Sequence, residues 1–308
     1  MTIDTSVQVG SLRLANPVMT ASGTAGHGME FAPYGDLSAL GAFVAKSLAA
    51  YAWQGNPPPR VHPTPQGMIN SVGLQGPGVA AWLRDDYPAL EAAGVQVVAS
   101  IWGRSVADYA AAATALATAG PAVIAVEVNL SCPNLEGRSG IFGHDARLSA
   151  DVISASAVCG RPMWAKLSPN TDRLVEVAAA VQTAGADAVT LINTLLGMVV
   201  DQTSLRPVLG NGGGGLSGRA IHPVAVRCVF DVHSALPDLA VVGVGGVASG
   251  WDAVELIAAG ASAVQVGTAS FANPRAPWTV QSELIAWLRE RGLSGVADLV
   301  GSAHQARE

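Results

Sequence analysis

Several polar residues of this sequence follow directly after short apolar runs that are typical of buried strands. Two are lysines, Lys46 after AFVA and Lys166 after PMWA. Such a lysine is either solvated or needs a partner, because burying an unpaired ammonium is costly. An anionic or electron-rich ligand would supply that partner, so the pattern indicates a binding site. The other residues at strand ends are Ser22, Ser47, Ser100, Asn129, Asn193, Thr194, Gly245, Gly246, Gly267 and Thr268.

Cys132 lies just past one of these runs, in the turn Asn129-Leu-Ser-Cys-Pro-Asn134. A free cysteine is commonly a small buried hydrophobe. Here a glycine-containing loop continues the turn, and such a segment can act as a lid that carries a reactive group. A thiol serves as a base where positive charge or hydrogen bonds favour its thiolate. Cys159 and Cys228 fall in helical patterns, and we interpret both as structural.

Glycines follow the last two apolar runs, in Gly243-Val-Gly245-Gly-Val-Ala248 and in Gly267-Thr268. Glycines at these places let backbone N–H groups approach a phosphate. The first stretch also matches a dinucleotide-binding fingerprint, but the acidic residue expected about 20 positions later is missing. A monophosphate, such as that of flavin mononucleotide (FMN), is therefore favoured. The alternative is that the glycines only form tight strand-to-helix turns.

Carboxamides recur beside these positions, and each offers both hydrogen-bond donors and an acceptor. Any one of them is an ordinary turn or cap residue. Together they could line a cyclic substrate whose edge alternates N–H and C=O groups. The residues are Asn70, Asn129, Asn134 and Asn193.

The elements that would position these residues alternate along the chain. Strands are expected over 17–22, 42–47, 95–100, 122–129, 162–167, 187–193, 239–245 and 262–267. Helices are expected over 79–93, 105–119, 147–159, 171–184, 221–235, 249–259 and 276–291. Eight such units predict a closed (β/α)8 TIM barrel, an α/β fold, formed by residues 1–308 as a single domain. The long connections 48–78 and 194–220 leave strand ends on the C-terminal face, where barrel enzymes keep their chemistry.

The composition excludes several classes of protein. The net charge is −6 and the pI about 5.5, without a Lys/Arg cluster, so a nucleic-acid or anionic-membrane partner is not expected. The 3 cysteines and 6 histidines are scattered, which predicts neither a disulfide framework nor a metal site. No signal peptide is recognised, and the uncharged stretch 109–126 is broken by Gly120-Pro121. We therefore expect a cytoplasmic protein without a membrane span.

The order of these motifs resembles class 1 dihydroorotate dehydrogenases, flavin enzymes that oxidise dihydroorotate to orotate in pyrimidine (UMP) biosynthesis. The resemblance covers almost the whole chain, whereas class 2 enzymes use a serine base and a membrane-docking N-terminal helix. The motifs are Lys46-Ser47, Gly55-Asn-Pro-Pro-Pro-Arg60, Gly67-Met-Ile-Asn-Ser-Val-Gly-Leu-Gln75, Asn129-Leu-Ser-Cys-Pro-Asn134, Ala165-Lys166-Leu167, Ile192-Asn-Thr-Leu-Leu-Gly197, Gly214-Gly-Leu-Ser-Gly218, Gly243-Val-Gly-Gly246 and Gln265-Val-Gly-Thr268.

Two stretches that overlap these motifs, 73–78 and 193–198, are similar to the 1B branch, and the fumarate-using branch is resembled less well. The resemblance implies FMN as cofactor, and an electron-transfer subunit that carries FAD and an iron–sulfur cluster and reduces NAD. It also implies a homodimer or a heterotetramer. Nothing in the chain itself indicates a cluster site, since three scattered cysteines could not hold one.

The resemblance also assigns roles to residues. Cys132 would be the base that removes the C5 proton while FMN takes the C6 hydride, with Lys46 and Lys166 assisting. FMN would contact Ser22, Lys46, Ser47, Ser100, Asn129, Lys166, Ile192, Gly218, Gly245, Gly246, Gly267 and Thr268. The substrate would contact Lys46, Asn70, Ser71, Val72, Gly73, Leu74, Asn129, Asn193 and Thr194.

One position departs from the family pattern, which usually has Asn where this chain has Ser100, followed by Trp102. The serine can still donate a hydrogen bond but reaches less far, so its flavin contact is in question. Two rival functions also remain: a related dihydropyrimidine-type flavin oxidoreductase, and a barrel that has lost its chemistry and only binds a partner.

Overall fold

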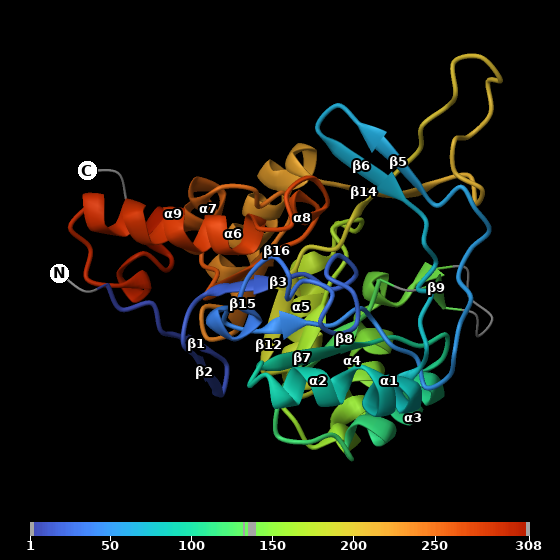
Figure 1. The fold of residues 1–308 in the computed structure, drawn as a ribbon, viewed down its shortest axis with the longest axis horizontal. Coiled ribbons are helices and arrows are strands. Elements are labelled where there is room, and N and C mark those ends of the chain that lie inside the picture. The colour runs from blue at the N-terminus through green and yellow to red at the C-terminus, as the bar shows by residue number, and fades with distance from the viewer. Residues whose placement is uncertain (1–2, 132, 135–139, 306–308) are drawn as a thin grey trace.

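The computed structural model describes residues 3–131, 133–134 and 140–305, and its centre is an eight-stranded parallel barrel (Figure 1). The strands follow one another around the barrel in chain order, because the sheet order is β3-β16-β15-β12-β11-β8-β7-β4. A parallel bridge between Met19 and Ala42 joins the two edge strands and closes the sheet. The strands are β3 Val18–Thr20, β4 Phe43–Val44, β7 Val97–Ile101, β8 Val123–Asn129, β11 Met163–Lys166, β12 Ala188–Leu191, β15 Ala240–Val244 and β16 Ala263–Val266. The predicted TIM barrel is confirmed.

Helices cover the outside of the barrel at the predicted places. They are α1 Val79–Asp85, α2 Tyr87–Ala92, α3 Val106–Leu116, α4 Ala146–Ser156, α5 Leu174–Thr183, α6 His222–Ala235, α7 Gly250–Ala258, α8 Ala269–Ala272 and α9 Ala276–Glu290. Polar residues cap several starts: the side chains of Ser105, Asp145 and Ser249 each accept a backbone N–H of the first turn. The single helix expected over 79–93 is two helices, because Pro88 stands at the start of α2, where a proline fits.

The two long connections form a second, smaller sheet of antiparallel strands in the order β13-β14-β6-β5. Its strands are β5 Val61–Thr64, β6 Gly67–Asn70, β13 Leu195–Gly197 and β14 Gly214–Ser217. The pairing of Asn70 with Gly215 joins segments that lie far apart in sequence. This sheet leaves the C-terminal ends of the barrel strands and lies at the upper right of Figure 1.

Short strand pairs complete the described structure. The hairpin β1 Val7–Val9 and β2 Leu12–Leu14 was not predicted. The Ser11 hydroxyl donates to Asp187, just before β12, so this hairpin lies at the N-terminal end of the barrel. The pair β9 Pro133–Asn134 and β10 Gly140–Ile141 follows β8 at the opposite end.

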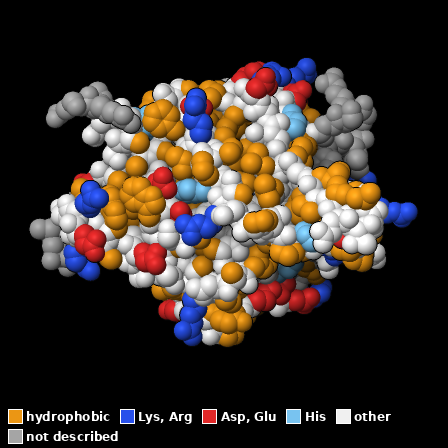
Figure 2. Space-filling model, turned by 90° about the horizontal axis from the view of Figure 1, so that it is seen from above, with side chains coloured by type: hydrophobic (Ala, Val, Ile, Leu, Met, Phe, Trp, Pro, Cys, Tyr) orange, Lys and Arg blue, Asp and Glu red, His pale blue; other side chains and the backbone are white. Residues whose placement is uncertain are grey.

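The uncharged stretch 109–126 is divided between α3 and β8, as predicted. In the parts of the chain that the structure describes, no helix combines the length and the apolar character needed to cross a bilayer. Seen from the side of the second sheet, apolar side chains alternate with charges of both signs (Figure 2).

Candidate active site

A buried charge network fills the inside of the barrel below its C-terminal mouth. Lys166, the last residue of β11, is 4% exposed, and its Nζ lies 3.4 Å from Oε1 of Glu127. The same ammonium donates to Ser22 Oγ at 3.2 Å and to Gln265 Oε1 at 3.4 Å, while Gln265 donates to the other Glu127 oxygen at 2.8 Å. Lys166 therefore has a counter-charge within the protein, Glu127, which sequence reasoning did not predict; its contact with a ligand stays a prediction.

Lys46 has a different environment, although it also follows a barrel strand. It is half-buried, and burial followed by the charge of Arg60 lowers its pKa. Among the described residues, no carboxylate forms an ion pair with Lys46 and no hydrogen bond of its ammonium is formed. It lines a cavity of about 700 Å³ together with His27, Trp53 and Gln75. Binding of a ligand by Lys46 stays a prediction.

A chain of short polar contacts crosses the mouth from β4 to β12. Asn193 donates to Asn129 Oδ1 at 3.0 Å, and Asn129 donates to Ser47 Oγ at 3.3 Å. The hydroxyls of Ser47 and Ser100 lie 2.9 Å apart. Ser100 is fully buried, so its side chain acts by holding Ser47. Ser100, which stands where the family usually has Asn, thus makes its contact with the hydroxyl of Ser47.

The second sheet brings the predicted substrate residues to the same end. Asn70 donates to the carbonyl of Gly215 at 3.3 Å. Thr194 packs on the other side of Gly215, because a Cβ added there would lie 2.1 Å from Thr194 Oγ1. Asn70 and Thr194 are therefore neighbours across one glycine, which no local pattern predicts.

The segment 71–74 is held by an earlier part of the same long connection. Trp53 Nε1 donates to the carbonyl of Gly73 at 2.9 Å, and Asn56 donates to the carbonyl of Ser71 at 3.1 Å. Leu74 has φ +62°, which is uncommon for a residue with a branched side chain. Strained residues of this kind gather at ligand sites. Val72 belongs to the same turn, since its carbonyl accepts from the Asn56 backbone N–H at 3.1 Å.

The predicted glycine residues form a second cluster beside the mouth. Gly245 and Gly246 have φ values of +136° and +72°, and a Cβ on Gly246 would lie 2.9 Å from the carbonyl of Gly218. Gly218, Gly246 and Thr268 line one cavity of about 640 Å³ with Arg219. The Thr268 hydroxyl donates to Ser217 Oγ at 2.8 Å.

Two more predicted residues connect this cluster to the mouth. Ile192 is buried, and its Cγ1 lies 3.3 Å from where a Cβ of Gly245 would stand. Gly267 packs on Ala21, the residue before Ser22, since an added Cβ would lie 3.2 Å from Ala21 Cβ. The cluster therefore adjoins the residue that contacts Lys166.

Sequence reasoning missed four residues: Glu127, Gln265, Ser217 and Arg219. A signal existed for the first two, because an acid and an amide interrupt the apolar strands AVIAVEVN and AVQVG. Ser217 and Arg219 carry no such signal, since each lies in a glycine-rich or loop segment.

The three cysteines divide between described and undescribed parts of the chain. Cys132, the predicted base, lies outside the described residues, as does the side chain of Asn134. Burial raises the pKa of Cys159, and burial followed by Asp231 raises the pKa of Cys228 to about 11. These shifts agree with the structural roles predicted for both.

Comparison with known proteins identifies the family. The family model described as dihydroorotate dehydrogenase matches residues 5–288. A protein of Trichlorobacter lovleyi named dihydroorotate dehydrogenase B (NAD(+)), catalytic subunit, is 47% identical over 96% of this chain and 97% of its own. Proteins of the same name from Desulforudis audaxviator and Pelobacter propionicus are 47% and 45% identical, over 99% and 97% of this chain and 99% and 98% of theirs. The chain belongs to the dihydroorotate dehydrogenase family.

Proposed function

We propose that the protein oxidises (S)-dihydroorotate to orotate in the de novo synthesis of pyrimidine nucleotides, with FMN as its bound cofactor. The observation that carries the proposal is the near-full-length match to relatives whose printed name states this activity. The polar residues at the barrel mouth support it, because enzymes of this fold place their chemistry at that end.

The glycine cluster fits the phosphate of FMN. A phosphate needs backbone N–H groups at close range, and glycines leave space for it. At Gly246 a side chain would collide with Gly218, so the close approach of the two segments depends on glycine. Arg219 lines the same cavity and adds a positive charge.

Bound FMN would supply the redox chemistry by accepting a hydride from C6 of the substrate. Lys46 would bind the anionic edge of the substrate, since its ammonium has no described partner. Asn193 uses one of its two amide hydrogens on Asn129, which leaves the second for a substrate carbonyl. Lys166, fixed by Glu127 and Gln265, would place positive charge at the base of the site.

Cys132 is proposed as the base that takes the C5 proton, on the strength of its position after β8. Replacing Cys132 by Ser should slow reduction of the cofactor sharply at neutral pH and move its pH dependence upward, because a hydroxyl is a weaker base than a thiol. Unchanged rates in C132S would remove this residue from the mechanism.

We also propose a partner subunit that carries FAD and an iron–sulfur cluster and delivers electrons to NAD. Two copies of this chain would form a homodimer or, with two partner subunits, a heterotetramer. The relatives are named as catalytic subunits of an NAD(+) enzyme, which supports a second subunit. Purification with and without the proposed partner subunit, followed by assays with NAD and with fumarate, would distinguish the two class 1 branches.

The central test is an anaerobic absorption spectrum of the purified protein. Dihydroorotate should bleach the bound flavin, whereas dihydrouracil, which lacks the carboxylate, should not. Bleaching by dihydrouracil alone would favour a dihydropyrimidine-type oxidoreductase. A colourless protein that takes up no FMN would reject the proposal.

A further inference from the structure

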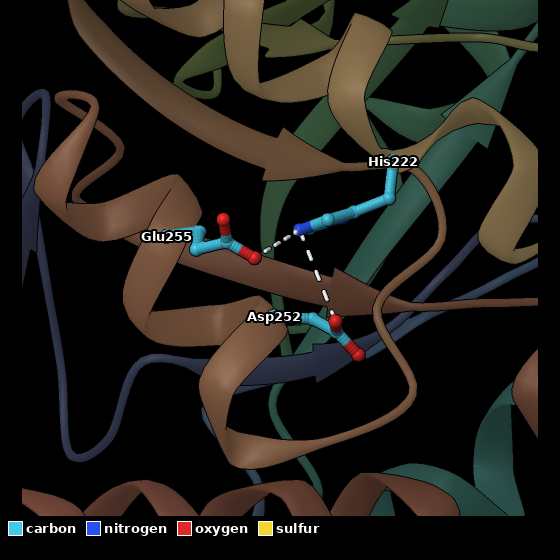
Figure 3. A group of neighbouring side chains, drawn as sticks. All are labelled: His222, Asp252 and Glu255. Atoms are coloured by element: carbon cyan, nitrogen blue, oxygen red, sulfur yellow. Dashed lines mark hydrogen bonds and ion pairs between the residues drawn. The ribbon is translucent and has the colours of Figure 1, made fainter.

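A buried histidine near the glycine cluster faces two carboxylates of helix α7 (Figure 3). His222 is the first residue of α6 and is 8% exposed. Its Nδ1 lies 2.8 Å from the carbonyl oxygen of Gly245. A carbonyl oxygen only accepts hydrogen bonds, so Nδ1 must carry the hydrogen and donate it.

The other ring nitrogen of His222 faces two carboxylates of α7. Nε2 lies 3.3 Å from Glu255 Oε2 and 3.9 Å from Asp252 Oδ1 (Figure 3). A carboxylate only accepts, so this contact is a hydrogen bond when Nε2 carries a hydrogen as well as Nδ1; Glu255 then holds the ring in the orientation that the bond to Gly245 requires. Orienting a histidine through its second nitrogen is a common device at functional sites.

Asp252 fastens the same loop from its far end. Its Oδ2 accepts the backbone N–H groups of Ala248 at 2.9 Å and Ser249 at 2.8 Å. The segment from Gly245 to Ser249 is therefore held by His222 at its start and by Asp252 at its end. Between these anchors lies Gly246, which lines the cavity assigned to the phosphate.

A metal ion is the alternative reading of His222, Asp252 and Glu255, because their ligand atoms lie within 4.8 Å of one another. Two contacts argue against it. Arg219 Nη2 stands 3.8 Å from Asp252 Oδ1, where it would repel a cation. Asp252 Oδ2 is also already occupied by the start of α7. The geometry fits a hydrogen-bonded bridge.

Resting on the FMN site proposed above, we propose that His222 is a positioning residue for the cofactor phosphate. Glycines have the largest conformational freedom of any residue, so Gly245 and Gly246 lose much entropy when they adopt one shape. The His222 bond to Gly245 selects that shape before the phosphate arrives. His222 also packs under Gly246, where an added Cβ would lie 2.6 Å from His222 Cβ.

Comparing FMN with riboflavin separates this role from a general structural one, because riboflavin has the same ring system but no phosphate. The His222→Phe variant keeps an aromatic ring and loses both polar contacts. We expect its dissociation constant for FMN, measured by quenching of flavin fluorescence on titration with apoprotein, to rise about tenfold, the equivalent of one net hydrogen bond. The constant for riboflavin should not change.

Three further variants complete the experiment. His222→Asn retains a donor near the position of Nδ1 and should recover most of the FMN affinity. The matched control is His233→Phe, a change in the same helix away from the glycine cluster, which should bind FMN like the wild type. If His222→Phe does not fold, Glu255→Ala provides the measurement, because it removes the partner of Nε2 at a partly exposed position; an FMN constant raised about threefold with riboflavin unchanged is expected.

Three outcomes would overturn the inference. One is a folded His222→Phe protein that binds FMN as tightly as the wild type. Another is an equal loss of affinity for FMN and riboflavin. A third is FMN affinity that changes when ZnCl2 or EDTA is added, which would assign the three side chains to a metal. A wild-type chain that binds no FMN would reject the proposed function together with this inference.

Discussion

Lys166 and Glu127 form a buried ion pair, with Nζ and Oε1 3.4 Å apart and the two side chains 5% and 0% exposed. Lys46 lies at the same end of the barrel without a described counter-charge. Both lysines follow a barrel strand, but Lys166 is paired with a buried carboxylate and Lys46 has no described counter-charge. Their replacement should have opposite effects on stability.

The Lys166→Met variant should lower the free energy of unfolding by about 3–5 kcal/mol, because it leaves the Glu127 carboxylate buried without its partner. The double variant Lys166→Met/Glu127→Gln should recover most of this loss. Urea unfolding of the apoproteins measures both. A single variant as stable as the wild type would mean that the ion pair contributes nothing to the fold.

The Lys46→Met variant should be more stable than the wild type by about 1 kcal/mol, since water screens much of the burial penalty at this half-buried site. Burial lowers the pKa of Lys46, so the cost of burying its charge is present as long as the ammonium is protonated in the folded protein. It is relieved as the pH rises through the folded-state pKa toward 10.5. The stability that Lys46→Met adds, measured by urea unfolding, should therefore become smaller at alkaline pH.

The same variant should lose reduction of the cofactor by dihydroorotate, because the charge proposed to bind the substrate is removed. Anaerobic stopped-flow spectroscopy measures this. Full activity together with raised stability would show that Lys46 has no part in binding.

The Gly246→Ala variant should bind FMN more than tenfold less tightly, because the new Cβ collides with Gly218 and His222. Gly292→Ala is a matched control: its φ of +69° is close to the +72° of Gly246, and nothing lies within 4 Å of an added Cβ. Both variants should lose about 1–2 kcal/mol of stability from the left-handed backbone. Equal FMN affinity in the two variants would mean that Gly246 is not part of the phosphate site.

Alkylation should distinguish the three cysteines. Since the pKa of Cys228 is about 11, only about a thousandth of it is thiolate at pH 8, and burial raises the pKa of Cys159 as well. Folded Cys132→Ser protein should therefore react very slowly with iodoacetamide at pH 8. Mass spectrometry of the labelled peptides provides the measurement. Rapid labelling of Cys159 or Cys228 in that variant would contradict the assignment.

The sequence determined the barrel, because its strands are mainly apolar, with few polar interruptions such as Glu127 and Gln265, and such segments are buried in a barrel. It also indicated which residues stand at the strand ends, since all parallel strands present their carboxyl ends on one face. The roles of Cys132 and of the other site residues remain predictions.

Only the tertiary structure decided which of these residues meet. The Asn70–Gly215 pairing, the Lys166–Glu127 ion pair and the His222–Gly245 bond join residues 145, 39 and 23 positions apart. Local patterns report the burial and backbone shape of each segment by itself. Partners across a closed barrel depend on how the strands come together around the axis, and this is a property of the whole chain.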